Sequence, residues 1–133
     1  MSILEEGIYT YLSAQSSIVA ICGSRIYPAL LPQDPELPAA VFYNIGTYPV
    51  AVQSGKPTLA RTRLQVDCYA VTIRQAKELA NVIRDALESY VGLMGVHQVQ
   101  AVFVLEHGID DYDDVPNDFR ITSEFELWHN IVA

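Results

Sequence analysis

The sequence predicts an α+β domain with a mainly antiparallel four-stranded sheet, on which a long helix and an N-terminal helix pack. Two observations lead to this prediction. The stretch Leu64–Tyr90 changes at Thr72 from a two-residue to a 3.6-residue apolar period, which indicates a strand that runs directly into a helix. The segments follow in the order helix, hairpin, helix, hairpin, which is typical of an antiparallel sheet with helices on one face.

The chain is predicted to be one domain, residues 1–133, because this length supports a single hydrophobic core. Half of the residues are hydrophobic and only 18% are charged, which is at the apolar end of globular composition. This balance favours a protein that buries apolar surface against other subunits. An apolar but monomeric domain is the alternative.

The N-terminal helix is expected over Ile3–Ser13, where apolar residues recur at helical spacing and Ser2 with Glu5 matches a capping box. A short helical turn is expected to follow and to end at Gly23. The segment Pro28–Pro38 contains four prolines, which exclude regular structure and favour a semi-rigid extended loop. This loop is either an interaction arm or a simple crossover.

Alternating or apolar runs predict four strands, at Ala39–Tyr48, Thr58–Ala70, His97–His107 and Phe119–Ile131. The first two are expected to form a hairpin around a turn at residues 54–57. An acidic loop, Asp110–Asp118, precedes the last strand.

The long helix is predicted to begin at Thr72, which forms a Thr-x-x-Gln capping box with Gln75. Gly92 supplies a C-terminal stop. Between them the apolar positions fall on one helical stripe: Ala76, Leu79, Ala80, Ile83, Ala86, Leu87 and Tyr90. That stripe is expected to cover one face of the sheet.

The last strand places Trp128 on a side that is otherwise charged, which is unusual for tryptophan. The other strands are expected to carry a mixture of aromatic, aliphatic and polar residues on the same outer face: Phe42, Tyr48, Tyr69, Val102, Val104, Arg61, Arg63 and Gln100. Such a composition is typical of a protein interface. Alternatively, a second helix layer formed by the N-terminal segment covers this face.

The sequence contains no known catalytic motif, metal-type cysteine spacing or nucleotide-binding glycine pattern, so we expect neither an enzyme nor a cofactor. His97 and His107 stand at the two ends of one predicted strand, too far apart to share a metal. The acidic loop either binds a hard cation, forms a solvated turn or makes an acidic contact surface. Cys22 and Cys68 are expected to be buried free thiols.

The formal net charge of −8 would repel a phosphate backbone, so no sequence-independent binding of nucleic acid is expected. The N-terminus has no basic region before an apolar run, and no apolar run is long enough to span a bilayer. We therefore expect a protein of the cytosol without membrane contact.

Several segments, taken in their order and spacing, resemble the tail-completion family of long-tailed bacteriophages, whose members are similar to the lambda tail terminator. The matching segments are Gly23–Pro28, Pro38–Tyr43, Arg63–Ala70 with Thr72 and Ala76, an acidic loop before Phe119–Ile121, and Glu126–Trp128. None of these residues is catalytic.

The resemblance implies a structural protein that forms a ring, usually a hexamer, at the head-proximal end of the tail tube, in the neck of the virion. The ring would be assembled in the bacterial host cytoplasm, would stop growth of the tube and would present a surface to the head connector, or stopper, while DNA passes through it. A head-tail connector or neck protein is one alternative, and a small α+β ligand-binding module or enzyme is another.

A ring needs two different complementary patches on each subunit. We expect the interface with other subunits, the tube or the connector at Phe42, Tyr48, Arg61, Arg63, Tyr69, Trp128, Asp111, Asp113 and Asp114. In this hypothesis the arginines and the tryptophan of one subunit meet the aspartates of the next.

Overall fold

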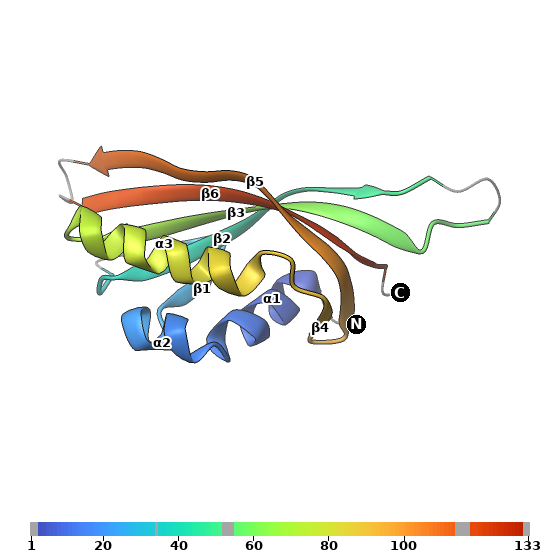
Figure 1. The fold of residues 1–133 in the computed structure, drawn as a ribbon, viewed down its shortest axis with the longest axis horizontal. Coiled ribbons are helices and arrows are strands. Elements are labelled where there is room, and N and C mark those ends of the chain that lie inside the picture. Colours follow the sequence, from blue (N-terminus) through green and yellow to red (C-terminus); the bar gives the residue numbers. More distant parts are fainter. Residues whose placement is uncertain (1–2, 34, 52–54, 114–117, 132–133) are drawn as a thin grey trace.

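The computed structural model describes residues 3–33, 35–51, 55–113 and 118–131. Its strands form one sheet, and the helices of the described residues all lie on the same side of it (Figure 1). The elements are α1 Leu4–Ser13, α2 Ser16–Cys22, β1 Ile26–Pro28, β2 Ala39–Pro49, β3 Leu59–Ala70, α3 Ile73–Leu87, β4 Gly92–Met94, β5 His97–Asp113 and β6 Asp118–Asn130.

The sheet has six strands in the order β1-β2-β3-β6-β5-β4, and it curls into a half-barrel. β1 runs parallel to β2, and the other neighbours are antiparallel. The expected four-stranded, mainly antiparallel sheet with a long helix is therefore wrong: the sheet is mixed, and the three helices have 10, 7 and 15 residues. β1 and β4 have three residues each, which is too short for an alternating pattern to be recognised.

α3 begins where the sequence predicts. The Thr72 hydroxyl accepts a hydrogen bond from the Gln75 amide at 3.3 Å, which is one half of the expected capping box. The helix ends at Leu87 rather than at Gly92, because Ser89 adopts a left-handed backbone with φ 61° and turns the chain, while Gly92 begins β4. The predicted stripe is largely confirmed, since the buried residues of α3 are Ala76, Leu79, Ala80, Ile83 and Leu87.

Replacing Thr72 with alanine is expected to lower the free energy of unfolding by about 1 kcal/mol, because the first turn of α3 loses its side-chain acceptor. Urea denaturation followed by circular dichroism would measure this loss. Thr72→Ser keeps the hydroxyl and should remain close to the wild type. Equal losses in the two variants would show that the cap bond is not the cause.

α1 packs against the β4–β5 turn through Gly7. A Cβ atom built on Gly7 would lie 2.2 Å from the carbonyl oxygen of Met94, so the helix and the turn are in direct backbone contact. The Tyr11 hydroxyl donates to the carbonyl of Ala86 and ties α1 to α3. The residue before α1 is Ile3, which makes no side-chain cap bond, and the Ser2 of the expected capping box lies outside the described residues.

The core lies between the helices and the inner face of the sheet. Its largest fully buried side chains are Phe42, Phe125, Ile8, Leu12, Ile18, Leu64, Leu79, Ile83, Leu87, Met94, Ile121 and Leu127. Cys22 and Cys68 are buried free thiols, as predicted, and burial raises the pKa of both.

Two long segments extend beyond the core. β5 continues six residues further than expected and takes in the first aspartates of the predicted acidic loop, whereas β4 pairs only with its first three residues, His97–Val99. The β2–β3 hairpin projects past the helices at one end of the molecule (Figure 1). No helix within the described ranges combines the length and hydrophobicity needed to cross a membrane.

Candidate functional site

The outer face of the sheet, turned away from the helices, is the main candidate site. The odd-numbered residues of β3 point to this face, because the even-numbered residues are those buried against the core. α1 and α2 lie with α3 on the inner side (Figure 1), so the alternative of a helix layer over the outer face is wrong for the described residues.

Aromatic and charged side chains form a connected cluster at the centre of this face. We call Tyr48, Arg61, Arg63, Glu124, Glu126 and Trp128 the outer-face cluster. Arg61 lies opposite both Tyr48 and Trp128 in the strand register, and its guanidinium carbon is 5.4 Å from the centre of the Tyr48 ring.

Both arginines of the cluster have carboxylate partners within the same chain. Arg61 pairs with Glu126 at 3.4 Å, and Arg63 pairs with Glu124 at 2.7 Å. The Trp128 indole also donates to Glu126, at 2.8 Å. Because these pairs are partly exposed, each contributes at most about 1 kcal/mol to stability, so the cluster matters more for the shape and neutrality of the face.

A second polar group continues the outer face on the side of Asp67. This carboxylate is nearly fully buried and accepts hydrogen bonds from Thr122 at 2.8 Å and Gln65 at 3.2 Å. The pKa of Tyr43 is raised to about 12, mainly by burial and to a smaller extent by the neighbouring Tyr69 and Asp67. Tyr43 therefore stays neutral under physiological conditions.

Some of the expected outer-face residues lie elsewhere. Phe42 is only 1% exposed and belongs to the core, so its predicted position on the outer face is wrong. Val102 and Val104 pair with Leu127 and Phe125 and also face inward. The outer face instead receives two residues of β5 that the sequence analysis missed: Phe103, 52% exposed, and Ile109, 50% exposed.

The expected aspartates are only partly described. Asp111 forms an ion pair with Arg120 of the same chain. The side chain of Asp113 and all of Asp114 lie outside the described residues. In the part of the chain that the structure describes, no group of three or more His, Cys, Asp or Glu is placed to hold a metal ion.

Two histidines that are 32 positions apart meet on the inner face, beside a pocket of about 370 Å³. The ring of His97 lies 6.0 Å from that of His129, centre to centre. His129 Nδ1 lies 2.8 Å from the carbonyl of Asn130, so it carries the proton, and Nε2 accepts from the Thr62 hydroxyl at 2.7 Å. The sequence does not reveal that these two rings lie close together, because their proximity depends on the register of β5 against β6.

Stability is expected to fall as the pH drops below about 6.5, the usual pKa of histidine. Burial lowers the pKa of His129, so the unfolded chain binds this proton more readily than the folded one. Between the lowered folded-state pKa and about 6.5, acid therefore favours unfolding. Urea midpoints of the wild type and His129→Gln at pH 7.5 and 5.5 would test this, and an unchanged pH dependence in the variant would contradict it.

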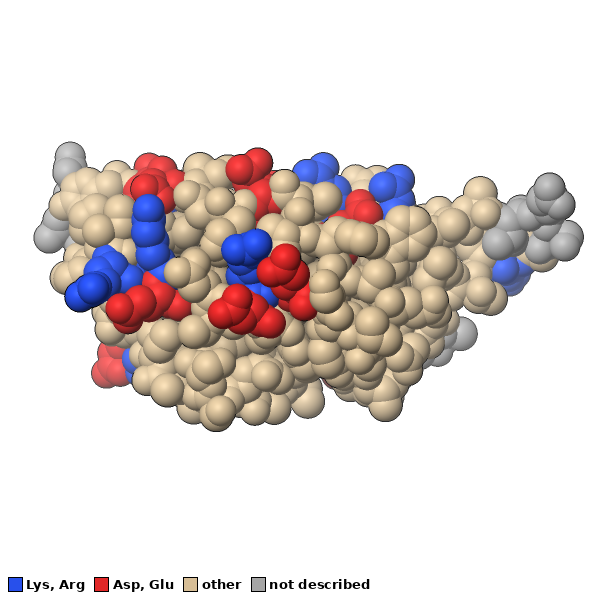
Figure 2. All heavy atoms as spheres, in the orientation of Figure 1, with Lys and Arg blue, Asp and Glu red and all other residues tan. Residues whose placement is uncertain are grey.

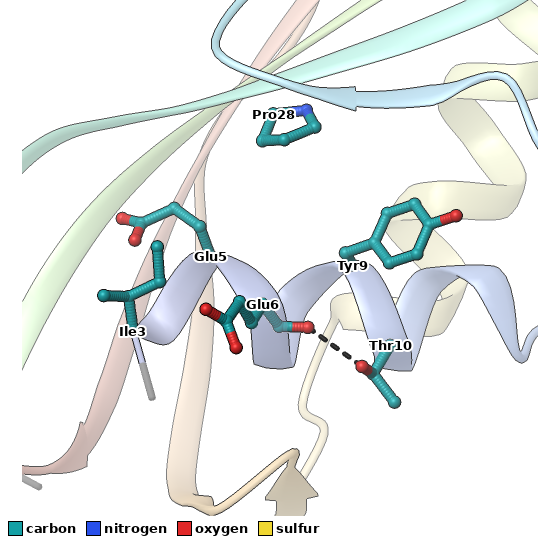
Figure 3. Close-up of a pocket in the computed structure, with 6 residues that line it drawn as sticks. All are labelled: Ile3, Glu5, Glu6, Tyr9, Thr10 and Pro28. Atoms are coloured by element: carbon teal, nitrogen blue, oxygen red, sulfur yellow. Dashed lines mark hydrogen bonds between the residues drawn. The ribbon is translucent and has the colours of Figure 1, made fainter. Parts of the chain in front are cut away.

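A second pocket, of about 430 Å³, lies between α1 and β1. We call it the α1 groove, and its lining residues are Ile3, Glu5, Glu6, Tyr9, Thr10 and Pro28. Figure 3 shows Pro28 facing α1 across the groove, with both carboxylates towards one end and the Tyr9 ring towards the other. The groove is therefore apolar with an acidic end.

Charge is unevenly distributed over the surface. Figure 2 shows acidic and basic side chains interspersed over α3 and the sheet, while the surface below them is mostly uncharged in this view. The described residues of the projecting hairpin include basic side chains and no acidic ones (Figure 2). This hairpin and the acidic end of the α1 groove are thus electrostatically complementary.

Comparisons with known proteins agree with a structural role. The chain is similar in fold to a chain of the virion of a native gene transfer agent particle, with a TM-score of 0.79 and 16% identity over 98% of this chain and 96% of that one. Another solved chain matches with a TM-score of 0.54 and 16% identity, over 100% of this chain and 97% of the other. A search of curated proteins found no significant match. Residues 6–130 match the family of the tail completion protein gp17, so the chain belongs to this family of structural bacteriophage tail proteins.

Proposed function

We propose that the protein assembles as a six-membered ring at the head-proximal end of the tail tube, in the neck of the virion. There it ends growth of the tube and offers a surface to the head connector. Subunits are made and assembled in the cytoplasm of the bacterial host. DNA passes through the ring without specific binding, and the net charge of −8 supports this because it disfavours contact with phosphates.

The open outer face of the sheet carries this proposal. It presents Tyr48, Phe103 and Ile109, each at least 44% exposed, beside charged residues that already neutralise one another. Exposed aromatic and aliphatic side chains surrounded by paired charges have the composition of an interface with a polar rim. The projecting β2–β3 hairpin supplies a second, different patch, which a head-to-tail ring requires.

Native mass measurements over a concentration series, followed by electron microscopy, would test the ring. We expect a closed six-membered species whose formation is weakened by Phe103→Ser. Val91→Ser is the matched control, since Val91 is 65% exposed but lies between α3 and β4, away from the outer face. A strict monomer at every concentration, also in the presence of tail tubes, would contradict the proposal.

A second measurement separates tail completion from the connector alternative. Purified protein would be mixed with isolated tail tubes and, separately, with tailless heads. We expect it to cap one end of the tubes. Binding to heads alone would assign the protein to the head side of the junction.

A further inference from the structure

We propose that the β2–β3 arm of one subunit docks into the α1 groove of its neighbour and places Lys56 against Glu5 and Glu6. The arm is the described end of the β2–β3 hairpin, residues 50–51 after β2 and 55–58 before β3. This inference rests on the proposed ring and specifies one of its contacts.

The first argument is the pairing of basic residues. The chain has eight Lys and Arg residues, and seven of them make ion pairs with carboxylates in the described structure: Arg25, Arg61, Arg63, Arg74, Lys77, Arg84 and Arg120. Lys56 alone has no such partner among the described residues. It is exposed on the arm, where it is the only charged residue between Asn44 and Ala60.

The second argument is the matching acidic site. Glu5 and Glu6 are adjacent in the first turn of α1, and neither has a basic partner in the described part of the chain. Glu5 accepts a hydrogen bond from the side-chain amide of Asn44, at 3.2 Å. Two neighbouring carboxylates without a counter-ion attract a cation, and an apolar wall beside them strengthens the attraction by lowering the local dielectric.

The third argument is the apolar lining of the groove. Ile3 is 53% exposed and Tyr9 is 40% exposed, so both still offer apolar surface. The methylene stem of a lysine packs on such surface while its ammonium group reaches the carboxylates. Pro57 follows Lys56 in the chain, and Val50, whose amide donates to the Leu59 carbonyl, adds a further apolar side chain to the arm.

The arm is placed to reach another subunit. The last pair of β3 with β6 is Leu59 with Asn130, and the Thr58 carbonyl still accepts a hydrogen bond from the Ile131 amide, so the arm leaves the sheet beyond Thr58. Figure 1 shows it directed past the helices and away from the α1 of its own chain. One arm and one groove on each copy form a head-to-tail contact, which is the type of contact that a cyclic ring requires.

Each contact is small, so its effect comes from repetition around the ring. An exposed ion pair contributes at most about 1 kcal/mol, whereas a closed ring makes the contact once in every subunit. The arm contact therefore adds to the outer-face interface and fixes the register of each subunit against its neighbour.

Charge reversal gives a direct test. Lys56→Glu gives an acidic arm with a wild-type groove, and the double variant Glu5→Lys with Glu6→Lys gives a basic groove with a wild-type arm. Each alone is expected to raise the protein concentration needed for half-maximal ring formation about tenfold or more, because every contact becomes repulsive. Circular dichroism would confirm that both variants fold, as expected for changes in partly or fully exposed side chains.

An equimolar mixture of the two variants is expected to form rings again, with the two kinds of subunit alternating. Each acidic arm then meets a basic groove, and each wild-type arm meets a wild-type groove. Native mass spectrometry would show equal numbers of both variants in each ring. The matched control is Lys77→Glu, which reverses the other lysine, on α3, and should not replace Lys56→Glu in the mixture.

The outcomes separate this inference from the ring itself. Wild-type rings together with normal rings from both variants would overturn the arm contact and leave the ring proposal intact. Absence of wild-type rings at every concentration, also in the presence of tail tubes, would overturn both. Copies with Lys56→Cys and copies with Glu6→Cys should also form disulfide-linked pairs on oxidation, whereas Lys56→Cys with Glu78→Cys should not, and failure of the first pair would overturn the contact.

Discussion

Phe125→Ala is expected to lower the free energy of unfolding by about 3–5 kcal/mol. Phe125 is fully buried in the middle of β6, between Leu64 of β3 and Val104 of β5, and its ring faces the helices. Removing the ring costs its burial and leaves a cavity that the surrounding sheet fills only in part. Domains of this size are typically stable by about 5–15 kcal/mol, so the variant loses a large share of its total stability.

Urea unfolding followed by circular dichroism would measure this loss. Phe103→Ala is the matched control, because it removes the same ring from a residue that is 52% exposed on the outer face of the neighbouring strand. The control should lose less than about 1 kcal/mol. Similar losses in the two variants would contradict the division of the sheet into inner and outer faces.

Gly7→Ala is expected to destabilise the protein by about 1–3 kcal/mol, although alanine is the better helix former. In an exposed helix this substitution would stabilise by about 1 kcal/mol. At Gly7 the added Cβ would lie 2.2 Å from the Met94 carbonyl oxygen and 2.8 Å from its carbon, and both are backbone atoms that cannot rotate away. α1 must therefore move off the β4–β5 turn.

The expected loss of stability is opposite in sign to the gain that the same substitution gives in an exposed helix, so thermal or urea unfolding can test it directly. Ser17→Ala, at an exposed position of the neighbouring helix α2, should change the stability by no more than about 0.5 kcal/mol. A stabilised Gly7→Ala variant would show that the contact between α1 and the turn is looser than the structure indicates.

The long elements could be predicted from periodicity because each combines a repeating pattern with a local signal. The strand that ends near Ala70 and the helix that starts after Thr72 are both where the sequence places them. β1 and β4 escaped detection because their place in the sheet depends on pairing with distant strands. Such pairing leaves no pattern in three residues.

The outer face could be predicted only in part, and irregular strands are the reason. Phe42 and Tyr48 are six residues apart and would share a face in a regular strand. A register shift between Asn44 and Gly46 instead brings Tyr48 to the outer face and leaves Phe42 in the core. Similar shifts in β5, between Val99 and Ala101 and further along, hid the outward position of Phe103.

The pairs that organise the candidate site follow from strand register, which alternation alone does not provide. Arg63 and Glu126 are directly opposite in the register, yet the arginine bonds to Glu124, its diagonal neighbour. The prediction that Arg61, Arg63 and Trp128 lie on one face is confirmed. Whether they also contact an adjacent subunit stays a prediction.

The short β4 has a consequence for the solubility of the isolated subunit. It covers only His97–Val99, so within the described residues the rest of β5 has no strand on that side. An uncovered strand edge can recruit further chains into aggregates, and charged side chains along it oppose this. Glu106, Asp110 and Asp111 stand on this strand, and the last two are ion-paired with Lys77 and Arg120. Charged side chains on β5 thus make its edge less open to pairing with a strand of another molecule.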